Sequence, residues 1–183
     1  MSKVDKSKFN NSWFSPGRSK LIQILWYFTN AIFFKSYFFP FYSLKRFFLK
    51  AFGAKIGRRL LVKPDVNIKY PWKLVCGDYV SFGEGVWIDN LDHVTIGDNV
   101  TISQGAYLLC GNHDFKSRSF DLLVNPIYLE DGVWIGAKSI VAPGVRAGSH
   151  SVLAVNSVAI KDLEPYGIYQ GNPAQLLRQR EIA

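Results

Sequence analysis

The feature that most constrains the fold is a six-residue rhythm of apolar residues that begins at Ile56. This period matches neither the roughly 3.6 residues per turn of an α-helix nor the two-residue alternation of a β-strand. Repeats of this length are typical of a parallel β-helix built from hexapeptides, in which three hexads, about 18 residues, make one triangular coil. The leading positions are Ile56, Val62, Ile68, Cys76, Phe82, Ile88, Ile96, Ile102, Leu108, Leu129, Ile135, Val141, Ala147, Leu153 and Ala159.

The rhythm breaks in three places, after Ile68, Ile88 and Leu108. Because these three residues are twenty positions apart, they occupy the third hexad of successive coils, and the insertions that follow them leave the prism from one edge. The last insertion, residues 109–128, is a long loop, and long loops in compact domains are usually functional. We therefore expect a functional site along this edge.

Positive charge is concentrated ahead of the repeats. The net charge of the chain is +8, yet residues 65–183 alone carry about 9 basic and 13 acidic side chains. Between Lys6 and Pro64 there are about 12 Lys or Arg and no Asp or Glu. We expect the basic character to belong to an N-terminal extension, residues 1–55, and not to the β-helix.

The extension is also rich in aromatic residues and is expected to form two short helical pieces separated at Pro40. Its apolar run, residues 21–34, is shorter than the roughly 20 residues of a membrane-spanning helix. Two roles remain open: a cap on the open end of the β-helix, and an interfacial segment on an anionic membrane surface. Nucleic acid is not expected as a partner, because the aromatic residues form apolar runs and not spaced stacking positions.

The two cysteines, Cys76 and Cys110, provide no disulfide framework. The apolar stretch begins late and lacks the small-residue cleavage pattern of a secretory signal. The sequence is therefore expected to work in a reducing, cytoplasmic setting, with possible peripheral contact at the inner face of the membrane.

Several motifs resemble the hexapeptide acyltransferases. They are "GNHD" at 111–114, "EDGVWIGAKSIVAPGV" at 130–145 and "QGNPAQLLRQR" at 170–180, while "VNIKYPW" at 66–72 and "VWIDNLDHVTIGDN" at 86–99 resemble the colanic acid biosynthesis acetyltransferases in particular. The resemblance implies a left-handed parallel β-helix of about five coils over residues 56–166, a tail with a short helix over 167–183, and a homotrimer with sites between subunits. It also implies acetyl-CoA as co-substrate and an O-acetyltransferase that modifies a sugar hydroxyl of a polysaccharide precursor.

His113 is the candidate catalytic residue. It lies where the long loop leaves the stacked edge, and acyl transfer to a hydroxyl needs a base with a pKa near neutrality. The resemblance places the catalytic histidine of the family at this position. Of the other histidines, His93 is interpreted as a surface corner residue and His150 as a solvated turn residue. Direct transfer is expected, and a covalent route through Cys110 is the less favoured alternative.

The candidate binding residues fall into two groups, both of which depend on the resemblance. Those expected to contact coenzyme A are small or aromatic residues for the pantetheine arm and cations for the phosphates: Trp134, Gly136, Ala137, Ala154, Lys161, Arg178 and Arg180. Those expected to contact the acceptor are polar residues near the insertion edge: Asn90, Asp92, Tyr107 and Asp114.

Three rival functions remain. One is N-acetylation of an amino sugar or an amino acid. A second is a zinc lyase like the γ-type carbonic anhydrases, which needs three histidines around one metal; the histidine spacings of 20 and 37 residues do not fit that arrangement, and no metal site is expected. The third is a non-catalytic scaffold, which retention of "GNHD" and of the basic tail disfavours.

Overall fold

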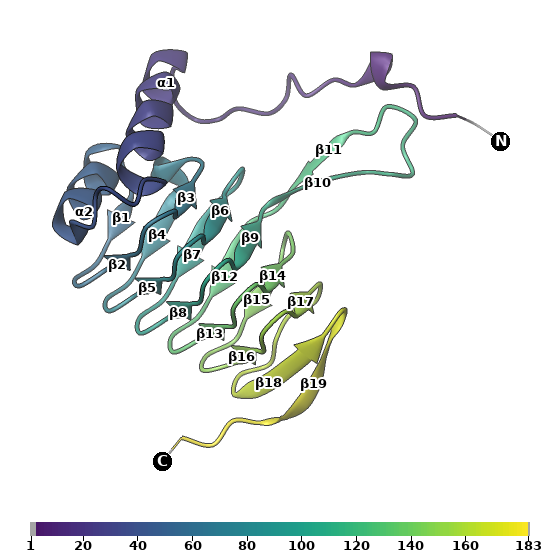
Figure 1. Cartoon of the computed structure of the whole chain (residues 1–183). Coiled ribbons are helices and arrows are strands. Elements are labelled where there is room, and N and C mark those ends of the chain that lie inside the picture. Colours follow the sequence, from purple (N-terminus) through teal and green to yellow (C-terminus); the bar gives the residue numbers. More distant parts are fainter. Residues whose placement is uncertain (1–2, 183) are drawn as a thin grey trace.

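The hexads fold into a parallel β-helix with helices at its N-terminal end (Figure 1). The computed structural model describes residues 3–182. The helices are η1, a 3-10 helix (Lys6–Lys8), α1 (Lys20–Thr29), η2, a π-helix (Asn30–Phe34), α2 (Tyr42–Ala51) and η3, a 3-10 helix (Pro71–Lys73).

Each face of the prism is one sheet, and its strands are parallel apart from the last strand of the second face. The first face holds β1 (Lys55–Ile56), β4 (Leu74–Cys76), β7 (Val94–Ile96), β12 (Ile127–Leu129) and β15 (Arg146–Ala147). The second face holds β2 (Leu61–Val62), β5 (Ser81–Phe82), β8 (Thr101–Ile102), β13 (Trp134–Ile135), β16 (Val152–Leu153), β18 (Gly167–Gly171) and β19 (Ala174–Gln179). The third face holds β3 (Asn67–Ile68), β6 (Trp87–Asp89), β9 (Tyr107–Leu109), β14 (Ile140–Val141) and β17 (Val158–Ala159).

The predicted leading residues pair with one another from coil to coil, which confirms the hexad register. On the third face Ile68 pairs with Ile88, Ile88 with Leu108, and Leu108 with Val141. Most leading side chains are fully buried and form the continuous core of the prism. The stacked edge after Ile68, Ile88 and Leu108 is therefore as predicted.

The number of coils was underestimated. The second face contains six parallel strands before its final antiparallel strand, so the solenoid has about six turns and not five. The sixth turn is formed by β18, where Tyr169 is buried in the leading position and pairs with Leu153. The spacing from Leu153 to Tyr169 is not a multiple of six, so the hexad pattern alone ends at Ala159.

The predicted C-terminal helix is wrong, because residues 174–179 form strand β19. The chain reverses at Gly171, whose φ of +106° suits glycine, and β19 returns antiparallel to β18. The last coil of a solenoid exposes an unpaired strand edge, and β19 satisfies the backbone groups of that edge.

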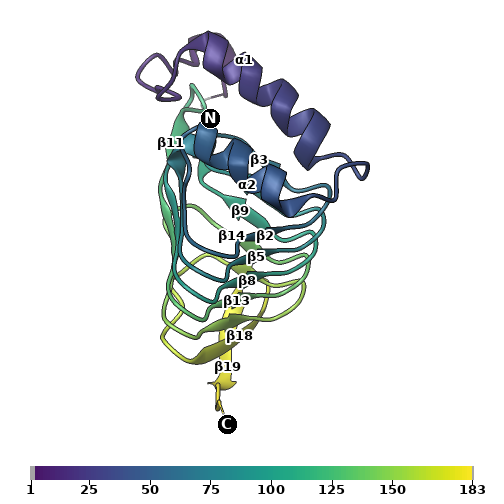
Figure 2. The same cartoon turned by 90° about the vertical axis from the view of Figure 1, so that its left-hand side faces the viewer.

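The N-terminal helices cover the opposite end of the solenoid (Figure 2). Lys45 of α2 is buried, and its Nζ donates to the carbonyls of Val62 and Lys63 at 3.3 and 2.9 Å. Trp26 of α1 donates to the carbonyl of Ile68 at 2.8 Å. These carbonyls belong to the first coil, so the extension caps backbone groups that no earlier coil can reach.

A membrane-crossing helix is not part of this cap. Over residues 3–182, no helix is both long enough and apolar enough to span a bilayer.

Candidate active site at the insertion edge

The third insertion builds the most prominent feature of the edge. Strand β10 (Gly111–His113) pairs antiparallel with β11 (Leu122–Val124), and the hairpin projects away from the prism (Figure 1). The predicted long loop is thus a two-stranded arm with a short tip, residues 114–121. His113 is the last residue of β10 and pairs with Leu122.

One ring nitrogen of His113 is held by the backbone of its own hairpin. Nδ1 lies 2.9 Å from the carbonyl oxygen of Phe120. A carbonyl can only accept, so Nδ1 carries the proton and Nε2 is left with a free lone pair. The Phe120 ring stacks on the imidazole with centroids 4.4 Å apart and planes 11° from parallel. The histidine is therefore fixed in the tautomer and orientation of a base that acts through Nε2.

Asp114 does not orient His113 but shapes the hairpin tip. Its carboxylate accepts from the backbone nitrogen of Lys116 at 2.9 Å, and its own backbone nitrogen donates to the backbone carbonyl of Asp121 at 2.8 Å. At the other side of the tip, hydrogen bonds from Ser119 and Ser117 lower the pKa of Asp121. These contacts hold the turn that brings Phe120 back to His113.

The N-terminal segment also reaches this hairpin. The backbone nitrogen of Asp5 donates to the carbonyl of Arg118 at 2.8 Å, and Lys6 lies 5.1 Å from the centre of the Phe120 ring. The Phe9 ring lies 5.9 Å from His113. Residues far apart in the sequence thus enclose one side of the imidazole.

Cys110 is poorly suited to a covalent role. Its side chain is fully buried, and burial raises the pKa of the thiol to about 12. A thiol needs to be ionised and accessible to attack an acyl group. The geometry therefore favours direct transfer over a route through Cys110.

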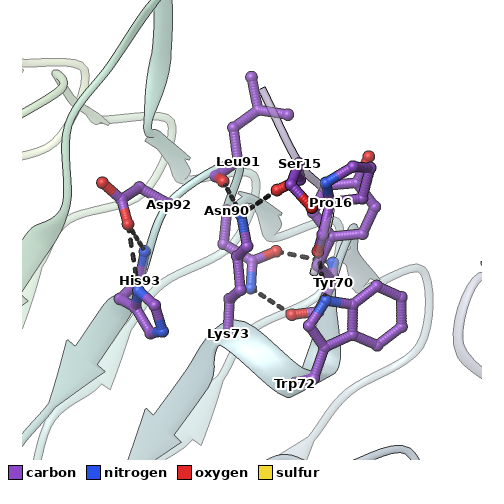
Figure 3. A network of polar contacts seen from close by, with 9 residues as sticks. All are labelled: Ser15, Pro16, Tyr70, Trp72, Lys73, Asn90, Leu91, Asp92 and His93. Atoms are coloured by element: carbon purple, nitrogen blue, oxygen red, sulfur yellow. Dashed lines mark hydrogen bonds and ion pairs between the residues drawn. The ribbon is translucent and has the colours of Figure 1, made fainter. Parts of the chain in front are cut away.

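The other two insertions are tied together by side-chain contacts with backbone groups (Figure 3). Asn90 is fully buried, and its amide group makes both hydrogen bonds to the backbone of Tyr70, at 2.9 and 2.6 Å. Asp92 accepts from the backbone and ring nitrogens of His93, the latter at 3.1 Å. Lys73 donates to the carbonyls of Leu91 and Ser15. Asn90 thus has a structural task, while Asp92 remains partly exposed beside His93.

A polar cluster next to this corner contains the predicted Tyr107 and two residues that the sequence did not single out, Asp89 and Lys69. Asp89 is only 7% exposed; its Oδ1 pairs with Lys69 Nζ at 2.9 Å and its Oδ2 accepts from the hydroxyl of Tyr107 at 3.3 Å. Burial, followed by the nearby Asp89 charge, raises the pKa of Tyr107, so its hydroxyl stays protonated. Tyr107 also stacks on the exposed indole of Trp87, with centroids 4.6 Å apart.

The predicted coenzyme A residues gather in a groove on the second face. The groove has a volume of about 540 Å³ and follows β13, β16 and the turns after them to β19. Six of the seven predicted residues line it, namely Trp134, Gly136, Ala137, Ala154, Arg178 and Arg180. Lys161 is exposed after β17 and is not among the lining residues.

Two contacts shape this groove. The Trp134 indole is half exposed and donates to the hydroxyl of Ser103 at 2.9 Å, so its ring forms a fixed wall. Arg180 donates to the carbonyls of Gly132 and His150, both at 3.0 Å, which anchors the end of the tail. Small residues along an apolar floor, with guanidinium groups at one end, suit a long ligand with an anionic terminus.

The three histidines do not converge. His93 pairs with Asp92, His150 stacks on Tyr166 with centroids 5.0 Å apart, and His113 is held in the hairpin. Among residues 3–182, no three His, Cys, Asp or Glu side chains are grouped so that they could hold a metal ion.

No protein-family model matches the chain. The "Putative colanic acid biosynthesis acetyltransferase WcaF" of Escherichia coli K12 is 40% identical over 139 residues, which cover 76% of each protein. The chain belongs to the hexapeptide-repeat acetyltransferases.

Two solved acetyltransferase structures have the same overall fold as this chain. A hexapeptide-repeat acetyltransferase of Vibrio cholerae, complexed with acetyl coenzyme A, superposes with a TM-score of 0.80 at 23% identity and covers 89% of each chain. A galactoside acetyltransferase in complex with coenzyme A superposes with a TM-score of 0.77 at 26% identity, over 88% of this chain and 82% of the other.

Proposed function

We propose that this acetyltransferase uses acetyl-CoA to O-acetylate a sugar hydroxyl of a polysaccharide precursor, with His113 as general base. The observation that carries the proposal is the hydrogen bond from Nδ1 of His113 to the Phe120 carbonyl, which leaves Nε2 as the proton acceptor. The names of the WcaF and galactoside acetyltransferase relatives support an acceptor in the sugar class.

The chemistry is a direct transfer. Acetyl-CoA would supply the acetyl group as a thioester. Nε2 of His113 accepts the proton of the sugar hydroxyl while the hydroxyl oxygen attacks the acetyl carbonyl carbon. A backbone N–H stabilises the negative charge that develops on the carbonyl oxygen. The carbon–sulfur bond then breaks, and His113 returns the proton to the leaving sulfur, which gives the sugar ester and free coenzyme A.

The groove on the second face is the proposed site for coenzyme A. Its small residues, Gly136, Ala137 and Ala154, leave room for the pantetheine arm beside the wall formed by Trp134. Arg178 and Arg180 are the candidate partners of the phosphates, together with the exposed Lys161 beyond the groove.

The acceptor site is proposed at the insertion edge, around Asp92, Tyr107 and Asp114 with Asn90 as support. Asp89, which accepts a hydrogen bond from the Tyr107 hydroxyl, is added to this set, and the exposed Trp87 ring stacks on Tyr107 beside it. A carboxylate and an aromatic face are the pair of groups that commonly recognise a sugar, through its hydroxyls and its apolar ring face.

The active site is proposed to lie between subunits of a homotrimer whose chains wind as left-handed β-helices. Within one chain, the groove follows the second face and the corner after it, whereas His113 leaves the corner after the third face. The proposed coenzyme A groove and the proposed base therefore lie at two different edges of the prism. In a cyclic trimer, one chain presents its groove to the hairpin of the next.

The test is an acetyl-transfer assay with labelled acetyl-CoA and a panel of sugar nucleotides and lipid-linked oligosaccharides, which includes amino sugars. We expect His113→Ala to lower turnover at least about 100-fold while the oligomer stays intact, since a general base contributes about that much. His150→Ala is the matched control, because the His150 ring stacks on Tyr166 and only its backbone carbonyl, which alanine keeps, contacts Arg180. Near-normal turnover of His113→Ala, or transfer to amino groups alone, would contradict the proposal.

A further inference from the structure

The N-terminal cap has a second apolar face that the β-helix does not use. Helix α1 and η2 bury Trp26, Asn30 and Phe34, which lie on one side of the helix and pack on the first coil. The opposite side carries five large apolar residues that are between 48 and 66% exposed, here named the outer stripe: Leu21, Ile24, Leu25, Phe28 and Ile32.

The spacing of the outer stripe makes it a continuous surface. Steps of three, one, three and four residues keep these side chains on one side of a helix, about 180° from the buried side. Helix α1 lies across the end of the solenoid (Figure 2). Since its buried side contacts the first coil, the outer stripe lies on the other side of the helix. Ile24 and Phe28 are at the margin of the stripe, where they also line a cavity beside Trp87. The next segment, residues 35–41, adds exposed aromatics, with Phe38 at 90%.

The charge around the outer stripe points to an anionic partner. Exposed Lys20 and Lys35 stand at its two ends, and residues 6–64 carry twelve Lys or Arg and no Asp or Glu. A symmetric contact of this face with the same face of a second copy is disfavoured, because it would bring two cationic surfaces together. Contact with a different face of a neighbouring copy is an outcome that the oligomeric state of the variants tests below. Exposed apolar side chains flanked by cations are the composition of a helix that lies in a bilayer interface.

We infer that the outer stripe docks the enzyme on an anionic lipid bilayer, with α1 lying in the plane of the membrane surface. The apolar side chains enter the interface, and the flanking lysines contact anionic headgroups. The coenzyme A groove begins at β8 and ends at β19, toward the other end of the solenoid, so docking leaves it open to water (Figure 1). This binding is independent of the proposed acceptor and of catalysis.

The test is co-sedimentation of the full chain with vesicles of phosphatidylcholine alone or with roughly 30% phosphatidylglycerol. We expect binding only to the anionic vesicles and release at about 1 M salt, where the Debye length falls to about 3 Å. Ile24→Ser with Phe28→Ser should reduce the partition coefficient at least tenfold, and Lys20→Gln with Lys35→Gln should reduce it about fivefold per lysine.

Two controls separate lipid docking from misfolding and from self-association. Ile182→Ser removes an exposed apolar side chain at the far end of the molecule and should leave binding unchanged. Thermal unfolding and gel filtration of the double variants should match the parent chain. No binding to anionic vesicles, equal binding to neutral ones, full binding by the Ile24→Ser, Phe28→Ser variant, or a change in its oligomeric state would overturn the inference.

Discussion

At the scale of single residues, the account depends on how His113 is held. Its Nδ1 proton is bound by a backbone carbonyl, which no substitution of a side chain removes directly. The ring of Phe120 adds the second constraint by stacking on the imidazole. The side chain of Phe120 is thus a positioning group that can be removed while its carbonyl remains.

We predict that Phe120→Ala lowers kcat about tenfold, less than loss of His113, because a loosened imidazole spends less time in the productive orientation. The measurement is the pH profile of kcat and KM for both variants with one acceptor. An orienting role lowers kcat with little change in KM for acetyl-CoA. A rise in KM at constant kcat would show instead that Phe120 contacts a substrate.

Some site residues could be read from the sequence and others could not. The place of His113 at the stacked edge was predictable, because it stands in the largest break of a strict repeat. Its role as the base stays a prediction that depends on the resemblance as well as on this position. The pair of Lys69 and Asp89 left a readable signal as well, since each follows a leading residue of the third hexad, twenty positions apart, and stacking brings them together. The Phe120 carbonyl that accepts the hydrogen bond from His113 left no signal in the sequence, because every residue has a backbone carbonyl.

At the scale of elements, the corners of the prism are stacked so closely that only glycine fits at some positions. A Cβ on Gly97 would overlap the carboxylate of Asp131 and lie 2.8 Å from its backbone nitrogen. Gly105, which has a φ of +66°, faces open space, with its closest contact 3.5 Å from Lys138. Gly97 is thus required because there is no room for a Cβ, whereas Gly105 is favoured because of its positive φ.

We expect Gly97→Ala to lower the free energy of unfolding by about 3 kcal/mol, as overpacking against backbone does. Gly105→Asn should cost less than about 1 kcal/mol, because asparagine tolerates positive φ. Chemical denaturation of both variants measures the difference. Equal losses would contradict the stacking account.

The same corner carries a ladder of carboxylates that bind the coil before them. Asp78 accepts from the backbone of Arg58 at 2.7 Å, Asp98 from Asp78 at 2.6 Å, and Asp131 from Asp98 at 2.8 Å. The hydrogen bond from the Arg58 backbone, followed by the Arg58 side chain, lowers the pKa of Asp78 below its ordinary 3.8.

This shift predicts a pH dependence of stability. A carboxyl group with a lowered folded-state pKa stabilises the fold above its unfolded pKa, and that contribution is lost as the pH falls through the folded-state value. The stability gap between the parent chain and Asp78→Asn should therefore narrow from about pH 5 to pH 2 in thermal unfolding. A gap that stays constant over this range would show that the carboxylate is not ionised in the contact.

The two ends of the solenoid show where element prediction stops. The hexads were readable because each leading side chain enters the same core. The resemblance predicts a helix in the tail, but residues 174–179 instead pair with the open edge of β18. That edge exists only in the folded solenoid, so the local sequence does not reveal the strand. Likewise, the sequence favoured a cap but left open whether the extension only caps the prism or also contacts a membrane. The contacts of Lys45 and Trp26 with the first coil show the cap.

At the scale of the whole molecule, function is expected only in the assembly. His113 and the groove lie on different edges of one prism, so in the proposed mechanism a single chain offers the base without the donor site. The proposed cyclic trimer would create three composite sites, each with the hairpin of one chain and the groove of the next. Two inactive chains with different defects should therefore repair one another.

The most direct test is subunit complementation between His113→Ala and Ala137→Trp, a variant that fills the groove. The two chains carry different tags, are produced together and are purified through both tags, with each homotrimer as the control. Every mixed trimer then contains one site with an intact hairpin and an intact groove, so we predict about one third of the parent turnover while each homotrimer stays nearly inactive. Mixed trimers no more active than the homotrimers would show that the site is not shared between subunits.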